Sequence, residues 1–159
     1  MMDDALVIGL NRLVRRKPRL AKLIGATARW LAGVEIALMV MLGISGRRGS
    51  AVRMLAAVSV VYIASEGLGV LWLRQRPFAR LSNVSCLVPH DAGRSFPSRH
   101  VASGLAMASI GGREHPRLGL VMAMVAWLLG VSRVAAGLHY PSDVLAGAAL
   151  GWFLGRYVQ

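Results

Sequence analysis

The sequence predicts an all-α fold, an integral membrane helical bundle with about five transmembrane helices and an N-terminal interfacial amphipathic helix. Apolar residues make up 55% of the chain, and the mean hydropathy is +0.54; both values are high for a soluble domain. The apolar residues are also clustered into segments that approach the roughly 20 residues needed to cross a bilayer. This clustering disfavours the alternative, a soluble helical bundle with a large core. A length of 159 residues fits one domain, so we expect a single unit over residues 1–159.

The first expected element is a short amphipathic helix over residues 5–16. It has an apolar side and a basic side, formed by Leu6, Leu10, Leu13 and Val14 and by Arg12, Arg15 and Arg16, respectively. The segment is too short to span a bilayer, and its two-sided pattern is typical of a helix that lies in the membrane interface. Pro18 is expected to end it, because the residue before a proline is biased away from the helical conformation.

Five apolar segments follow and are interpreted as spans, at about 23–45, 52–73, 97–111, 118–135 and 141–158. Small residues recur in them, as in "LAGAALGWFLG", at spacings that let helices pack closely. Five spans place the loops 46–50 and 112–117 on one membrane face. The N-terminus and the loops 74–95 and 135–140 then lie on the other face, which gathers every polar group with catalytic potential.

The net charge is +12, from 19 Lys and Arg against 7 acidic residues. Basic loops in a membrane protein hold anionic lipid headgroups or set topology. No motif of a nucleic-acid-binding fold is present, so we expect membrane lipids and no nucleic acid as partners. The single cysteine, Cys86, has no partner for an internal disulfide and no metal-ligand spacing.

Three stretches on the polar face carry the chemistry: "RQRPF" at 74–78, "SFPSRH" at 95–100 and "SRVAAGLHYPSD" at 132–143. Together they contribute a group of cations, Arg74, Arg76, Arg99 and Arg133, with Arg94 just before the second stretch. A guanidinium stays charged and binds phosphate oxygens in a two-pronged geometry. Arginines at helix ends are individually more often topology anchors. Their coincidence on one face nevertheless predicts a phosphate pocket.

The same stretches carry two histidines and an aspartate. Pro141 is well placed to open the last helix, so Asp143 would lie in its first turn. From there its carboxylate could reach the imidazole of His139, fix its tautomer and leave the other ring nitrogen free to attack. His100 would lie at the start of another helix, where it could act as a general acid. A single His–Asp pair is more often structural, and only the combination indicates a catalytic site.

The three stretches resemble the motifs of the type 2 phosphatidic acid phosphatase superfamily, which includes the lipid phosphate phosphatases. The third motif of the family is Ser-Arg, five residues, His, three residues and Asp; it is met in full by Ser132, Arg133, His139 and Asp143. The second motif, Pro-Ser-Gly-His, is met by Pro97, Ser98 and His100, with Arg99 in place of Gly. The first, Lys, six residues and Arg-Pro, is met by Arg76 and Pro77, with Gly69 at the Lys position. The resemblance covers about residues 60–158.

The resemblance implies a catalytic role for His139, His100 and Asp143. His139 would attack phosphorus and form a phosphohistidine, Asp143 would orient it, and His100 would protonate the leaving oxygen and then activate water. Phosphate-binding roles are implied or expected for Arg76, Arg133, Ser98, Pro97, Arg74 and Arg99. Arg74 or Arg99 would supply the cation missing at Gly69. No metal and no cofactor would be needed.

The context "LVPHDAGRSFPSRHVASGLAMA" is most similar to the bacitracin-resistance type undecaprenyl pyrophosphate phosphatases. This resemblance implies a cell-wall biogenesis hydrolase that converts undecaprenyl pyrophosphate to undecaprenyl phosphate. The alternatives are a phosphatase of phosphatidic acid, phosphatidylglycerophosphate or another polyprenyl phosphate, or an inactive lipid-binding scaffold. Glu66, one turn before Gly69, is expected either to organise Arg74 or Arg133 or to serve packing alone.

The side of the membrane that carries the site is indicated by two opposing signals. The motif-bearing side holds about twelve Lys or Arg and the opposite side about six, which by the positive-inside rule would place the site in the cytoplasm. The resemblance implies an extracytoplasmic site in a multi-pass protein of the cell membrane. We adopt the second placement, because several of these arginines have functional roles in it.

Overall fold

A computed structural model of the chain describes residues 2–158. This part of the chain forms seven helices and no strand, which confirms the all-α prediction. The helices are α1 (Met2–Arg15), α2 (Pro18–Ile44), α3 (Arg48–Trp72), α4 (Pro77–Arg80), α5 (Arg99–Glu114), α6 (Pro116–Ala135) and α7 (Pro141–Tyr157). The short helix α4 was not expected from the sequence.

Prolines set most of the helix starts. Pro18, Pro77, Pro116 and Pro141 each stand at the beginning of a helix. At that position the missing N–H has no helical partner to lose, and the fixed φ angle already suits the helix. Pro141 therefore opens its helix as the sequence predicts, whereas Pro18, expected to end the first helix, also opens α2 five residues before the expected span.

Three of the helices, α2, α3 and α6, are long and apolar enough to cross a membrane, among the residues that the structure describes. They correspond to the expected spans at 23–45, 52–73 and 118–135. The other two expected spans fall on α5 and α7, which have 16 and 17 residues and do not meet this criterion. A total of about five spans therefore remains a prediction for these two helices.

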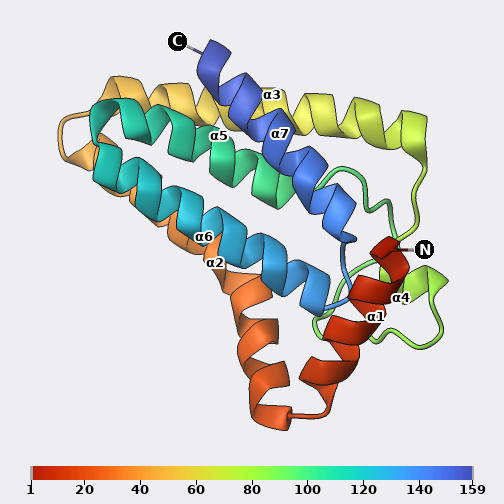
Figure 1. Cartoon of the computed structure of the whole chain (residues 1–159). Helices are drawn as coiled ribbons and strands as arrows, with labels where there is room; N and C mark the ends of the chain where they lie inside the picture. The colour runs from red at the N-terminus through yellow and green to blue at the C-terminus, as the bar shows by residue number, and fades with distance from the viewer. Residues whose placement is uncertain (1, 159) are drawn as a thin grey trace.

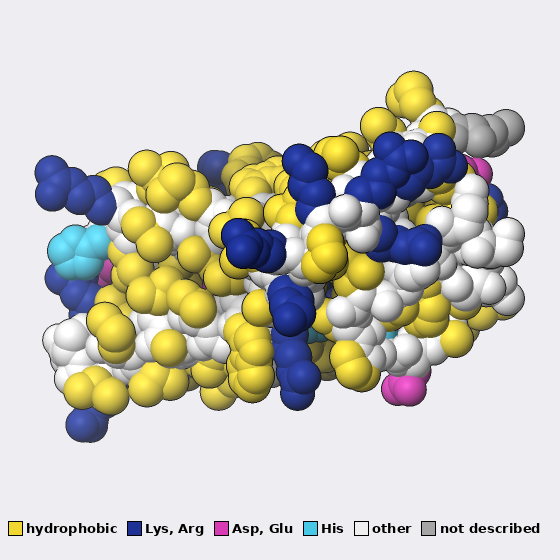
Figure 2. Space-filling model, turned by 90° about the horizontal axis from the view of Figure 1, so that it is seen from below, with side chains coloured by type: hydrophobic (Ala, Val, Ile, Leu, Met, Phe, Trp, Pro, Cys, Tyr) yellow, Lys and Arg dark blue, Asp and Glu magenta, His cyan; other side chains and the backbone are white. Residues whose placement is uncertain are grey.

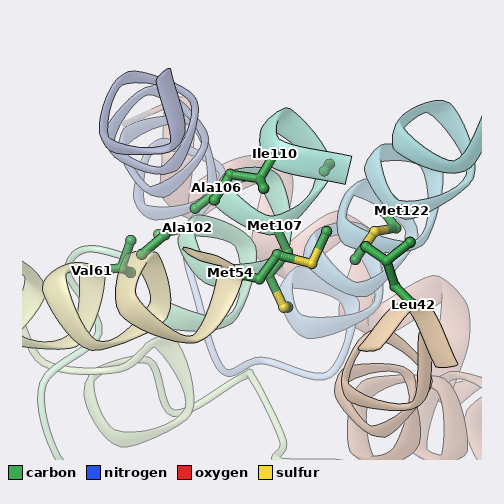
Figure 3. Packing of buried hydrophobic residues seen from close by; sticks show 10 residues of the cluster. Leu42, Met54, Val61, Ala102, Ala106, Met107, Ile110 and Met122 are labelled. Atoms are coloured by element: carbon green, nitrogen blue, oxygen red, sulfur yellow. The ribbon is translucent and has the colours of Figure 1, made fainter. Parts of the chain in front are cut away.

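Helix α5 lies at the centre of the bundle, between α3, α6 and α7 (Figure 1). Its Ala102, Ala106 and Ile110 belong to the largest buried apolar cluster (Figure 3). Met54 of α3 and Met122 of α6 belong to the same cluster, and both lie next to Gly111 of α5. A helix surrounded by other helices needs small or apolar residues on nearly every side. This explains the Ala, Ser and Gly content of α5.

Three glycines in successive turns bring α7 onto α5. A Cβ atom at Gly147 would lie 2.5 Å from the carbonyl oxygen of Ser98, just before α5. A Cβ atom at Gly155 would lie 2.7 Å from the carbonyl oxygen of Ala106 in α5. At Gly151, it would overlap the carbonyl of Ala102. Such spacings let two helices touch through their backbones. The contact fixes the start of α7, with Asp143, relative to the start of α5.

The connections lie at two ends of the molecule, as the alternation of spans predicts. The α2–α3 loop and the α5–α6 junction are at one end, where Glu114 accepts hydrogen bonds from Arg47 and Arg53 (Figure 1). The segment around α4, the α6–α7 loop and α1 are at the other end. Seen from below, an apolar surface is flanked by basic side chains, which gather over the half that carries α1 (Figure 2).

Helix α1 does more than lie on a membrane surface. Its Asn11 is fully buried and donates hydrogen bonds of 2.9 Å to the carbonyls of Ser85 and Ala135. Leu6 and Leu13 are exposed, as expected for residues that face lipid, but Val14 is buried in the protein. The helix is therefore docked onto the motif-bearing end as well as amphipathic.

Candidate active site

A cavity of about 400 Å³ opens at the motif-bearing end of the molecule. Its walls come from the last turns of α3 and from the loop that precedes α5. The lining side chains are mostly polar, and among them are Glu66, Arg76, His90, Asp91, Arg94 and Arg99. Residues distant in sequence thus meet where the loops converge, as the motif positions predict.

His139 is the buried nucleophile candidate next to this cavity. Its side chain is only 3% exposed. Its Nδ1 atom lies 2.8 Å from the carbonyl oxygen of Ser95, which can only accept a hydrogen bond. The proton therefore belongs on Nδ1, and Nε2 keeps a free lone pair. A guanidinium nitrogen of Arg76 lies 3.4 Å from Nε2. An anion attacked by Nε2 would therefore lie beside the positive charge of Arg76.

Burial and the neighbouring arginines hold His139 in its neutral form. Removal from water is the largest cause, and it lowers the pKa of His139 to about 4, with Arg133 and Arg76 acting in the same direction. A neutral imidazole at pH 7 is the form that can attack phosphorus.

Asp143 acts on His139 less directly than the sequence predicts. Its Oδ2 atom is 3.8 Å from His139 Nδ1, beyond hydrogen-bonding distance, and the Ser95 carbonyl occupies the expected place. The fully buried carboxylate instead accepts hydrogen bonds of 2.8 Å from the Tyr140 N–H and 2.7 Å from Arg74. Asp143 therefore fixes the backbone that carries His139 rather than the ring itself.

Arg76 and Arg133 are two buried guanidinium groups, 5% and 4% exposed. Arg76 donates a 2.9 Å hydrogen bond to the Leu138 carbonyl, and Arg133 donates one of 3.2 Å to the Ala28 carbonyl. Within residues 2–158 no ion pair is found for either, and the Nε atom of each has no hydrogen-bond partner. Burial, followed by the charge of Arg99, lowers the pKa of Arg76. Buried charges without a counter-ion are costly, so the pair favours a bound anion.

The second motif is divided between two cavities. Pro97 lines the polar cavity, and the hydroxyl of Ser98 is fully buried without a hydrogen-bond partner among the described residues. The N–H of Ser98 donates to the Asp143 carbonyl at 3.0 Å, which ties the start of α5 to the start of α7. His100 lines a neighbouring, mainly apolar cavity of about 360 Å³, together with Glu35. It is therefore near the polar cavity but not part of its wall.

The two arginines expected to compensate for Gly69 lie in different places. Arg99 lines the polar cavity. Arg74 does not: its guanidinium donates to Asp3 at 2.8 Å, to Ser142 at 2.6 Å and to Asp143, and it stacks on Tyr140 at 3.8 Å. The structure places Arg74 against Asp143, where it supports the loop that carries His139.

Sequence reasoning missed two residues of the cavity region, His90 and Ser95. The Nε2 atom of His90 lies 3.2 Å from Arg133 Nη2. Ser95 supplies the acceptor for His139, and Arg94 lines the cavity. Glu66 pairs with Arg94 and Arg99 rather than with Arg74 or Arg133. Both missed residues lie in the irregular segment before α5, where no periodicity indicates which side chains face inward.

No group of three or more His, Cys, Asp or Glu side chains with metal-binding geometry is found in residues 2–158. Arg76, Arg94 and Arg99 line the cavity, and guanidinium groups suit phosphate oxygens.

Comparison with known proteins gives one family. Residues 50–158 match the family model of the PAP2 superfamily. The chain is 37% identical over 95 residues to the bacitracin transport permease protein BcrC of Bacillus licheniformis, covering 60% of this chain and 47% of that protein. It is 33% identical over 86 residues to the undecaprenyl-diphosphatase BcrC of Bacillus subtilis (strain 168), covering 54% and 44%. The chain thus matches under half the length of these two relatives.

The fold is also similar to that of a solved structure. The crystal structure of Aquifex aeolicus LpxE aligns with a TM-score of 0.77 at 27% identity and covers 93% of this chain and 91% of that chain. The likeness therefore extends to α2, which the family model does not reach.

Proposed function

Because this chain belongs to the PAP2 superfamily, we propose that it is a membrane lipid phosphatase that hydrolyses undecaprenyl diphosphate to undecaprenyl phosphate. The proposed products are the lipid monophosphate and inorganic phosphate. The apolar helices α2, α3 and α6 suit a substrate with a long hydrocarbon tail. The relative in Bacillus subtilis that is called an undecaprenyl-diphosphatase supports the choice of substrate.

One observation carries the proposal: two buried guanidiniums without counter-ions lie beside a buried histidine. Arg76 is 3.4 Å from the free Nε2 atom of His139, and Arg133 is equally withdrawn from water. Preorganised cations of this kind stabilise the charge on a transferring phosphoryl group. A structural histidine would need no such surroundings.

The proposed first step forms a phosphohistidine. The lone pair of His139 Nε2 attacks the terminal phosphorus, and the bond from that phosphorus to the bridging oxygen breaks. The bonding electrons leave with undecaprenyl phosphate. Arg76 and Arg133 bind the oxygens of the transferred group, and the buried hydroxyl of Ser98 is proposed to donate to one of them.

The proposed second step releases inorganic phosphate. A water molecule gives a proton to His100 and adds to phosphorus, and the N–P bond breaks to restore neutral His139. His100 is also the proposed proton donor when the substrate is a phosphate monoester, because the alkoxide that then leaves needs a proton more than a phosphate does. His100 lies in the first turn of α5, two residues after Ser98, so this role requires its ring to turn from the neighbouring apolar cavity toward the polar one.

The experiment is phosphate release from the purified protein with undecaprenyl diphosphate, phosphatidic acid and phosphatidylglycerophosphate. We expect the diphosphate to give the highest kcat/KM. His139→Ala should reduce turnover below a tenth of that of the original protein. His115→Ala is the matched control, because His115 is exposed at the opposite end. Retention of more than a tenth of the turnover by His139→Ala would exclude His139 as the nucleophile.

A further inference from the structure

Building on the proposed function, we propose that Arg94 and Arg99 form a second phosphate subsite at the mouth of the cavity. This subsite binds the lipid-linked phosphoryl group of a diphosphate, while Arg76 and Arg133 bind the terminal one. Glu66 holds the two outer arginines when no substrate is present. The outer pair thereby makes the enzyme prefer diphosphates over monophosphates.

The cations of this region fall into two tiers by their exposure; Arg76, Arg94 and Arg99 line the cavity, and Arg133 lies behind it against His90. The inner guanidiniums of Arg76 and Arg133 are at most 5% exposed. The outer side chains of Arg94 and Arg99 are 36% and 43% exposed. A headgroup that approaches His139 through this cavity passes the outer pair, because Arg94 and Arg99 line the cavity. A diphosphate has a second charged group at that depth, whereas a monophosphate does not.

Glu66 is the counter-ion of the outer pair. Its Oε1 atom accepts a hydrogen bond from Arg94, and its Oε2 atom lies 3.4 Å from Arg99. The carboxylate is itself 52% exposed and lines the same cavity. A phosphate group can replace this carboxylate without leaving a buried charge unpaired, because all three side chains are at least one-third exposed. The inner arginines have no such carboxylate.

Gly69 provides the space that Arg94 occupies. A Cβ atom at this buried position of α3 would lie 3.6 Å from Arg94 Nε, 3.8 Å from its Cδ and 3.2 Å from the Phe96 carbonyl. The side chain of Arg94 therefore crosses the helix where residue 69 has no side chain. Any longer residue at 69 would compete with Arg94 for this part of the cavity wall.

The outer pair also fits the chemistry of a diphosphate. The leaving group is a phosphate monoester, and its developing negative charge lies on the group that the outer arginines would bind. Cations placed where charge develops lower the barrier of phosphoryl transfer. For a monoester substrate the leaving oxygen carries no phosphate, so the same cations have little to stabilise.

The test compares farnesyl diphosphate with farnesyl monophosphate as short-chain probes. Arg94→Ala should lower the diphosphate-to-monophosphate ratio of kcat/KM by roughly ten- to a hundredfold, the worth of a charge-assisted contact. Arg94→Lys should retain most of the ratio. Arg80→Ala is the control, because Arg80 is an exposed arginine of α4 paired with Asp4. Glu66→Gln should lower KM for the diphosphate, since no carboxylate must be displaced.

A double variant tests the geometry. Gly69→Lys in the Arg94→Ala background should restore the preference, because the lysine would enter the space that Arg94 left. An unchanged ratio in Arg94→Ala, or an equal loss for both substrates, would overturn the inference while leaving the proposed function intact. If the unmodified protein does not favour the diphosphate, the proposed substrate itself is wrong. If Arg94→Ala fails to fold, two measurements still test the inference. They are the diphosphate-to-monophosphate ratio of kcat/KM for Arg94→Lys and the KM of Glu66→Gln for the diphosphate.

Discussion

At the residue scale, a backbone carbonyl sets the tautomer of His139, and a carboxylate fixes the position of the backbone that carries this residue. The Ser95 carbonyl accepts a hydrogen bond from the Nδ1–H group of His139, and the Asp143 carboxylate accepts hydrogen bonds from the Tyr140 N–H and from Arg74. The family motif predicted His139 and Asp143 correctly as neighbours. It could not predict Ser95, because a backbone carbonyl leaves no mark in a sequence.

This geometry predicts a moderate effect of Asp143→Asn. The loss of one charged hydrogen-bond acceptor costs about 1.5–3 kcal/mol, so kcat should fall roughly ten- to a hundredfold. A carboxylate bonded directly to the catalytic imidazole would be worth about 10⁴-fold. Steady-state phosphate release from Asp143→Asn, with Ser142→Ala as a neighbouring control, distinguishes the two. A loss near 10⁴ would show that Asp143 contacts the ring during catalysis.

The buried neutral His139 also predicts a pH-dependent stability. Its pKa is about 4 in the folded protein and about 6.5 in an unfolded chain. Between these values the unfolded state binds a proton that the folded state does not, so stability is complete above pH 6.5 and falls as the pH is lowered. At pH 4.5 the loss is about 2–3 kcal/mol.

The measurement is the Tm in detergent at pH 7.5 and pH 4.5. We expect Tm to fall less between these pH values in His139→Asn than in the original protein, because an asparagine at position 139 does not titrate. His115→Asn, altered at an exposed histidine, should retain the full drop. An equal drop in all three proteins would mean that His139 is not buried as a neutral group.

At the element scale, the glycines of α7 determine whether the site can assemble. Gly151 lies directly against the Ala102 carbonyl of α5, and a side chain there would separate the two helices. The separation would pull Asp143 away from Ser98, whose N–H donates to the Asp143 carbonyl.

We therefore expect Gly151→Leu to lower both Tm and turnover, the latter by at least about tenfold. Overpacking of this kind typically costs about 1–3 kcal/mol. Gly33→Leu is the matched control, because nothing lies within 4 Å of a Cβ atom at that helical glycine. A Gly151→Leu protein with normal Tm and activity would contradict the close packing of α5 and α7.

The sequence predicted long helices better than short ones. The expected spans 52–73 and 118–135 agree with α3 and α6 to within four residues at each end. Helix α4 has only four residues, too few for a periodic pattern. The docking of α1 through Asn11 depends on carbonyls at Ser85 and Ala135. A pattern of apolar and polar residues carries no information about such distant partners.

At the scale of the whole molecule, we expect the two ends of the bundle to face opposite sides of the membrane. If the site is extracytoplasmic, Gly93→Cys at the cavity should react with a membrane-impermeant maleimide in intact cells. Gly49→Cys near the opposite loop should react only after the cells are permeabilised. Both positions are exposed with room for a side chain, and both variants are made in a Cys86→Ser protein. The reverse labelling pattern would place the site in the cytoplasm.

The candidate site as a whole joins three segments, around Arg76, Ser98 and His139, that are separated by more than 20 residues in sequence. Motif spacing predicted that they meet, because each stretch falls at the same end of successive helices. The inner arginines were predicted in this way. The division of the cations into an inner and an outer tier was not, since it depends on the conformation of the loop before α5.

The central claim is that His139 carries the phosphoryl group, and rapid quenching of the enzyme with undecaprenyl diphosphate labelled with ³²P in the terminal phosphate tests it most directly. The account predicts an acid-labile, base-stable label on the peptide that contains His139, formed as fast as undecaprenyl phosphate appears. The label should be absent from His139→Gln and present in His115→Gln. A labelled His139→Gln protein would contradict the account, as would steady phosphate release with no labelled enzyme at any time.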